Sequence, residues 1–210
     1  MELSDQPPSL RRKTGRPLSF NRDAALEQAM LTFWRHGYET TSIVDLTQAM
    51  GVTAPSLYAT FGDKRRLFLE AAALYAGDPE ERARAIDDAP SAYDAARAML
   101  AGAAIAYTGD ATPPGCLLAS ATASGSAASR DVQAAIADIR GRIRTTLEAR
   151  IRRDIDAGTM PFSTNPAALA GLVLAVVQGM SVLARDGAQR AALIAIADAA
   201  MGAWPRHGDP

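Results

Sequence analysis

The 210-residue chain has one cysteine, Cys116, and two histidines, His36 and His207. A single cysteine excludes an intrachain disulfide, and the lack of a CxxC pair or a His cluster leaves no metal site to predict. No apolar run approaches the length of a membrane span, and the polar N-terminus lacks the apolar core of a signal peptide. We therefore expect a cytoplasmic protein without a metal or other cofactor.

The sequence also lacks the motifs of common catalytic sites. It has no glycine-rich nucleotide-binding loop, and no serine lies in a G-x-S-x-G turn. A helical enzyme of unknown type stays open as an alternative, but the residues favour no particular reaction. The expectation is a protein that is not an enzyme.

The charge is uneven along the chain. Hydrophobic residues make up 48% and charged residues 21%, which is typical of a folded soluble protein. The net charge is −1, but residues 1–66 hold nine Lys and Arg against seven Asp and Glu. Within Leu10–Arg22 every charged residue is basic: Arg11, Arg12, Lys13, Arg16 and Arg22. This segment fits either a phosphate-contacting arm or a solvated tail.

The stretch Thr41–Lys64 has the pattern of two short helices joined by a glycine turn. Ser42 and Asp45 form an S-x-x-D capping box that opens the first helix, and Gly51 ends it. Thr53 caps the second helix, where proline is tolerated in the first turn. This is a helix-turn-helix pattern, whose second helix can enter the DNA major groove.

Residues 51–64, GVTAPSLYATFGDK, closely resemble the signature of the TetR/AcrR family of bacterial transcription regulators. The strong match runs from about Gly15 to Tyr75, and the later residues match in length and helical character. The resemblance implies an all-α protein with two parts. The first is an N-terminal three-helix helix-turn-helix head (residues 16–63), preceded by a flexible basic arm (residues 1–15). The second is a C-terminal helical body for effector binding and dimerisation (residues 64–210).

The resemblance also implies DNA contacts residue by residue. They are Arg16 in the arm, Thr41 and Ser42 before the first helix of the motif, Thr53, Pro55, Ser56, Tyr58, Ala59 and Thr60 on the recognition helix, and Lys64 just after it. Tyr58 is expected to meet a phosphate, and a half-buried core position is compatible with that role. The recognition helix presents no Arg, Asn, Gln or His outward, so we expect phosphate contacts, thymine methyl contacts and shape readout rather than bidentate base recognition.

The body is expected to contain helices at about 64–75, 80–88, 91–107, 131–155, 165–185 and 189–204. Leu74 and Ile105 are expected to face inward. Six arginines of the 131–155 helix are expected to form a solvated basic face: Arg140, Arg142, Arg144, Arg150, Arg152 and Arg153.

The last two helices are apolar nearly all round and must be covered on all sides. An isologous homodimer that joins them to their copies as a four-helix bundle satisfies this need. Such a dimer places two recognition helices about one DNA turn apart and predicts a palindromic operator.

The resemblance implies a ligand cavity in the body. Its expected wall residues are Met99, Ala103, Tyr107, Cys116, Leu118, Thr122, Ile143, Leu174 and Gln178. Few charges fall among them, so a small neutral or aromatic hydrophobic ligand is expected.

Cys116 follows a Pro-Pro-Gly loop at a helix start, where N–H groups favour the thiolate. Its oxidation or alkylation can then tilt the body and spread the heads. The alternative for Cys116 is a small buried apolar residue.

The predicted function is a homodimeric repressor released from its operator by a ligand or by cysteine modification. An effector-independent DNA-binding organiser is the alternative function. Effector identity, operator sequence and repressor versus activator stay open.

Overall fold

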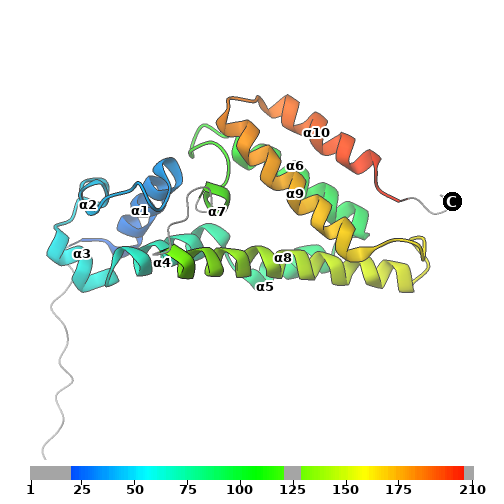
Figure 1. Ribbon diagram of the computed structural model, residues 1–210, viewed down its shortest axis with the longest axis horizontal. Helices are drawn as coiled ribbons and strands as arrows, with labels where there is room; N and C mark the ends of the chain where they lie inside the picture. The colour runs from blue at the N-terminus through cyan, green and yellow to red at the C-terminus, as the bar shows by residue number, and fades with distance from the viewer. Residues whose placement is uncertain (1–19, 121–128, 206–210) are drawn as a thin grey trace, which may run out of the picture.

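The computed structural model describes residues 20–120 and 129–205, and within these ranges the protein is built from helices alone. In chain order they are α1 (Arg22–His36), α2 (Ile43–Met50), α3 (Ala54–Phe61), α4 (Lys64–Ala76), α5 (Pro79–Asp87), α6 (Ala92–Tyr107), α7 (Leu117–Ser120), α8 (Arg130–Asp156), α9 (Pro166–Arg185) and α10 (Arg190–Gly202). Figure 1 shows α1 to α3 at one end of the molecule and α9 and α10 towards the other. The expected all-α fold class is confirmed.

The head helices begin and end where the sequence chemistry predicts. Asn21 caps α1 by accepting the backbone N–H groups of residues 23 and 24. The capping box of Ser42 and Asp45 is formed in both directions, and Gly51 takes the left-handed conformation with φ 66°. Thr53 accepts the N–H of Ser56 at the start of α3. Local caps therefore define the helix-turn-helix independently of the body.

An aromatic cluster holds α1 against α4. The ring centroids of Phe33 and Phe68 lie 5.1 Å apart in an edge-to-face arrangement, and Tyr38 lies 4.9 Å from Phe68. Leu57 and Phe61 of α3 are buried in the same core. Since α4 also packs on α8, this helix connects the head to the body, and α1 adds contacts to α7.

Three expectations for the body need correction. Leu74 is 48% exposed and borders a hollow between α1 and α4, and Ile105 is exposed too. The buried stripe of α6 instead runs through Ala92, Ala95, Ala96, Leu100, Ala103, Ala104 and Tyr107. An alanine-rich helix gives a weak periodic signal, because alanine occurs on every face, and the inward face is set by what packs against it.

The third correction concerns Arg150, which was expected on a solvated face but is only 6% exposed. Its Nε donates to Asp154 Oδ1 at 2.9 Å, and its Nη1 donates to the carbonyl oxygens of Asp87 and Ala89 at 2.8 and 2.6 Å. Asp154 Oδ2 accepts the N–H of Ala92 at 2.6 Å. This buried pair ties the end of α5 and the start of α6 to α8.

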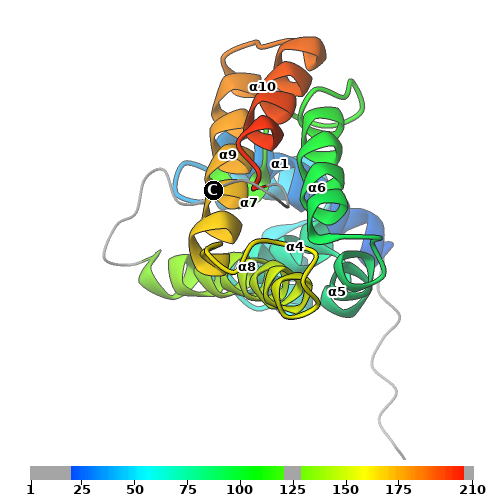
Figure 2. The ribbon, with the colours of Figure 1, turned by 90° about the vertical axis from the view of Figure 1, so that its right-hand side faces the viewer.

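The helices α6, α9 and α10 stand together above α8, as Figure 2 shows. Among the described residues, α9 alone is long and apolar enough to cross a membrane, with a mean hydropathy of 2.1 and 28% of the window buried. The expectation that no apolar run approaches a membrane span was therefore wrong for this helix. Core helices of soluble proteins have the same length and composition, so the finding is weak evidence for a membrane location.

Candidate functional site

The outward face of α3 has the composition that the sequence predicts. Leu57 and Phe61 point into the head core, while Tyr58 is 49% exposed. The other predicted contacts of this helix are exposed or partly exposed: Thr53, Pro55, Ser56, Ala59 and Thr60. The surface therefore offers hydroxyl groups, a phenol, a proline ring and a methyl group, which suit phosphates, water and thymine methyl groups.

The predicted phosphate contacts before α2 differ from each other. Thr41 is 1% exposed and its hydroxyl donates to the carbonyl oxygen of Gly37 at 2.6 Å, so this hydroxyl is not presented on the surface. Ser42 is exposed, and its hydroxyl contacts both the carboxylate and the N–H of Asp45. The hydroxyl and the backbone N–H of Ser42 both donate to the Asp45 carboxylate, and these two bonds lower the pKa of Asp45. Of the two residues, only Ser42 has its hydroxyl at the surface.

Lys64 is the first residue of α4, at the boundary between head and body. Its Nζ donates to the carbonyl oxygen of Glu39 at 3.2 Å and lies 4.8 Å from the ring centroid of Tyr38. Burial lowers the pKa of Lys64, and the nearby carboxylates of Glu39 and Asp45 oppose this effect. The ammonium is thus held by a carbonyl and an aromatic face. Arg16, the remaining predicted DNA contact, lies outside the described residues.

A second candidate site is a cavity of about 450 Å³ that lies between head and body helices and is open on one side. Eight of the nine predicted wall residues line it: Met99, Ala103, Tyr107, Cys116, Leu118, Ile143, Leu174 and Gln178. The ninth, Thr122, lies outside the described residues. The wall also includes residues that the sequence did not indicate: Trp34, Tyr75, Ala76, Arg82, Gly102, Ala106, Arg140 and Val177.

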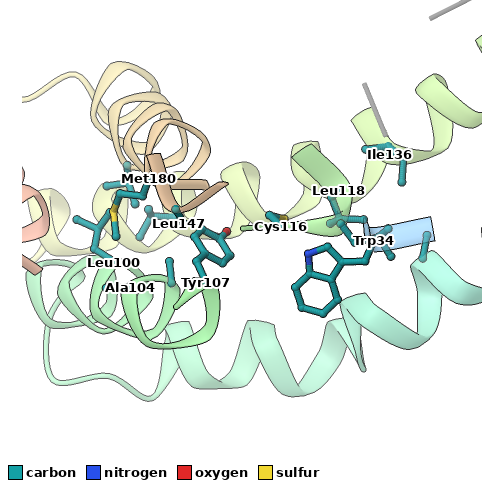
Figure 3. Packing of buried hydrophobic residues seen from close by; sticks show 14 of the residues in the cluster. Trp34, Leu100, Ala104, Tyr107, Cys116, Leu118, Ile136, Leu147 and Met180 are labelled. Atoms are coloured by element: carbon teal, nitrogen blue, oxygen red, sulfur yellow. The ribbon is translucent and has the colours of Figure 1, made fainter. Parts of the chain in front are cut away.

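Three polar side chains, those of Cys116, Tyr75 and Tyr107, lie close together in the wall of this cavity. Cys116 is buried, and its backbone N–H donates to the Ser181 hydroxyl on α9 at 2.8 Å. Burial, and then the neighbouring Cys116 thiol, raise the pKa of both Tyr75 and Tyr107, so both phenols are neutral at physiological pH. Figure 3 shows Tyr107 with its hydroxyl directed towards Cys116. The thiol belongs to the cavity wall and is therefore accessible to a small molecule inside it.

The cavity wall is more basic than the sequence analysis indicated. Arg82 of α5 and Arg140 of α8 belong to it, whereas no Asp or Glu is found among its described residues. The periodicity of α8 places Arg140 between Ile136 and Ile143, but sequence alone does not show which neighbour that face meets. The expected wall residues carry no charge, and among the described residues of the wall the two arginines alone add charge to them.

Trp34 connects the two candidate sites. It belongs to α1 of the head, yet its indole lines the body cavity and packs edge-to-face on Tyr75 at 4.8 Å. Its backbone carbonyl accepts a hydrogen bond of 2.8 Å from Arg185, at the end of α9. Arg185 also lies against Gly115, where φ is 78° and an added Cβ would lie 2.7 Å from the Ser181 carbonyl oxygen. The head, the cavity and α9 thus meet at one residue.

A helix-turn-helix head on a hollow helical body defines a class of all-helical DNA-binding regulator. Residues 25–71 match the family described as "Bacterial regulatory proteins, tetR family", and residues 93–199 match "Tetracyclin repressor-like, C-terminal domain". The chain is 32% identical over 204 residues to the HTH-type transcriptional repressor ComR of Escherichia coli K12, covering 96% of this chain and 97% of ComR. The chain belongs to the TetR family.

Solved structures agree with this assignment. A cysteine mutant of the TetR family regulator CifR, complexed with 26-bp double-strand operator DNA, is 39% identical, with a TM-score of 0.85 and coverage of 91% of this chain and 100% of CifR. A putative TetR regulator from Rhodococcus sp. RHA1 is 36% identical, with a TM-score of 0.58 and coverage of 87% and 98%. The protein is therefore a DNA-binding transcriptional regulator, and the relatives are regulators rather than enzymes.

Proposed function

We propose that this protein is a homodimeric repressor that binds a palindromic operator and leaves it when a small hydrophobic molecule enters the body cavity. The observation that carries the proposal is that the head residue Trp34 forms part of the cavity wall. A molecule in the cavity thus contacts the head directly. Such a regulator acts on chromosomal DNA, so we place it in the cytoplasm.

The proposed DNA-contacting residues are Arg16, Ser42, Thr53, Pro55, Ser56, Tyr58, Ala59, Thr60 and Lys64. Their exposure on the head, where the structure describes them, and the operator complex of CifR support this assignment. We propose the boundaries 1–15 for the arm, 16–63 for the head and 64–210 for the body. Affinity comes chiefly from phosphates, so binding is expected to weaken steeply as salt rises.

The proposed dimer interface lies on α9 and α10. Leu172, Val182 and Leu183 of α9 and Ile194 of α10 are between 39% and 56% exposed, although they are large apolar side chains. A second copy packed on these helices removes that surface from water as a four-helix bundle. The dimer sets the distance between the two heads.

Release from DNA follows from differential affinity. An effector that binds one arrangement of cavity and head more tightly shifts the population towards it. Trp34 and α4 carry the change, because α4 packs on both α1 and α8. Head spacing then no longer fits the two half-sites.

Modification of Cys116 is a second proposed trigger. Its thiol lines the cavity beside two neutral tyrosines, so a reactive small molecule inside the cavity reaches it. The CifR structures with DNA are of cysteine mutants, and this is a reason to test the cysteine of this chain as well. Cys116→Ser is expected to keep DNA binding and lose release by oxidants or alkylating agents. Unchanged release in the Cys116→Ser variant would rule out this trigger.

The first experiment is a DNA-binding selection from a randomised library, followed by anisotropy titrations at two salt concentrations. A palindromic consensus bound by a dimer, with affinity falling steeply with salt, supports the proposal. A selected DNA that no compound or oxidant releases supports the effector-independent alternative instead.

A further inference from the structure

The indole N–H of Trp34 is a buried donor without an acceptor. Trp34 is 4% exposed, and its Nε1 has no hydrogen-bond partner among the described residues. Figure 3 shows this nitrogen on the side of the ring that faces Cys116 and Tyr107, across the cavity. Buried donors in proteins are almost always paired, and the described part of the wall offers no acceptor to this one.

Two guanidinium groups border the same cavity. Arg82 and Arg140 form no ion pair with any described residue, and the described wall contains no carboxylate. An added Cβ on Gly77 would lie 3.9 Å from Arg82 Nη2, which places this guanidinium at the end of α4. Tyr75, two residues earlier, contacts the Trp34 ring. Arg82 and the Trp34 indole thus both lie near the end of α4, and Arg140 borders the same cavity from α8.

Apart from Cys116, the two tyrosines and the amide of Gln178, the rest of the described wall is apolar. Met99, Ala103, Leu118, Leu174 and Val177 provide a hydrocarbon surface on the remaining sides. The neutral phenols of Tyr75 and Tyr107 add hydrogen-bond donors but no negative charge. Such a wall suits a ligand with an apolar part and a single anionic, hydrogen-bond-accepting group.

We propose that the effector is an apolar organic acid, whose carboxylate is bound by Arg82 and Arg140 and accepts a hydrogen bond from Trp34 Nε1. This inference rests on the proposed effector function and names the chemical class of the molecule. Arginine suits the task because its planar donor groups match a carboxylate. The Trp34 contact makes the acidic group the part of the ligand that reaches the head.

The test compares carboxylic acids with their alcohols of equal size. Suitable probes are 2-naphthoate with 2-naphthalenemethanol, 4-phenylbutyrate with 4-phenylbutanol, and octanoate with octanol. Calorimetry measures each Kd, and anisotropy measures release of the selected DNA. At least one acid is expected to bind about tenfold or more tightly than its alcohol, because each charge-assisted hydrogen bond is worth about that factor.

Variants then identify the groups responsible. Arg82→Gln, Arg140→Gln and Trp34→Phe are each expected to weaken binding of the acid more than binding of the alcohol. Arg84→Gln on the exposed side of α5 is the matched control for Arg82, and Arg142→Gln, which lies outside this cavity, is the control for Arg140. Neither control is expected to change either Kd.

The outcomes separate this inference from the function on which it rests. Alcohols that bind as tightly as the acids and release the DNA would overturn the acid class while leaving the effector function standing. Acid binding that is unchanged in both Arg82→Gln and Arg140→Gln would also overturn the acid class and leave the effector function standing. If no acid or alcohol binds or alters DNA affinity in a dimer that holds its DNA, both the inference and the effector response are overturned.

Discussion

The head and the body are stabilised in different ways. In the head, polar side chains near helix starts are used locally: Asn21, Ser42 and Thr53 each satisfy N–H groups within three residues. The body uses similar caps at the starts of α5, α6 and α9, and it adds polar contacts between residues more than sixty positions apart, as in Arg150 with Asp87 and Cys116 with Ser181. The head is thus a local structure with a fixed surface, and the body is an assembly of distant segments around a space.

The largest test of this comparison is Arg150→Ala. The substitution leaves Asp154 buried without its partner and removes donors from the carbonyls at the end of α5. We expect the free energy of unfolding to fall by roughly 3–5 kcal/mol, as for other broken buried pairs. Urea denaturation followed by circular dichroism measures the change.

Arg152→Ala is the matched control, because Arg152 is exposed and pairs with Glu148 on the same helix. Its expected loss is less than about 1 kcal/mol. Equal losses in the free energy of unfolding for Arg150→Ala and Arg152→Ala would mean that the buried pair of Arg150 and Asp154 does not tie α5 and α6 to α8.

Leu57→Ala tests the head core. Leu57 lies on the inner face of the recognition helix α3 and is fully buried. Its truncation is expected to lower the free energy of unfolding by roughly 2–5 kcal/mol and to abolish specific DNA binding. Leu74→Ala removes a half-exposed leucine from α4 and should change stability by no more than about 0.5 kcal/mol. A large loss for Leu74 alone would show that the exposed face of α4 is covered in the functional protein.

Ser42→Ala tests local capping. The substitution removes the acceptor for the Asp45 N–H and the hydroxyl that contacts the Asp45 carboxylate. We expect a loss of about 1 kcal/mol, confined to the head. Hydrogen exchange should show faster opening of α2 and no change in α9. Faster exchange throughout the chain would contradict the separation between head and body.

Acidification should reduce the effect of this substitution. The folded-state pKa of Asp45 is lowered by its bonds to Ser42, so its contribution is present above the unfolded pKa and disappears as pH falls through the folded pKa. The stability difference between wild type and Ser42→Ala is therefore expected to shrink below about pH 4. Denaturation series at pH 6 and pH 3 measure it, and a constant difference would assign the capping effect to the neutral hydroxyl alone.

The sequence predicts the head better than the body for a physical reason. Caps, glycine turns and the apolar stripes of α1 and α3 depend on residues a few positions apart, so spacing alone identifies them. Eight of the nine expected wall residues line the cavity, because the resemblance indicated which helices surround the space, and their role in ligand binding stays a prediction. Arg150 and Arg82 were missed, since the neighbour of a helix face depends on tertiary packing that no short spacing encodes. Trp34 is buried, but its position at the cavity depends on where α1 meets the body.

A small effect on stability is also expected for Trp34→Phe, next to Phe33 in the chain. Phe33 contacts Phe68 and Tyr38 in the head core, whereas Trp34 faces the cavity and buries an unpaired donor. Replacing the indole by a phenyl ring removes that donor and adds only space to an existing cavity, so the two terms oppose each other. We expect a change within about 1 kcal/mol, compared with a loss of roughly 3–5 kcal/mol for Phe33→Ala. Denaturation of the two variants side by side measures this contrast. If Trp34→Phe proved as damaging as Phe33→Ala, the ring would be part of the head core, and the direct route from cavity to head would be lost.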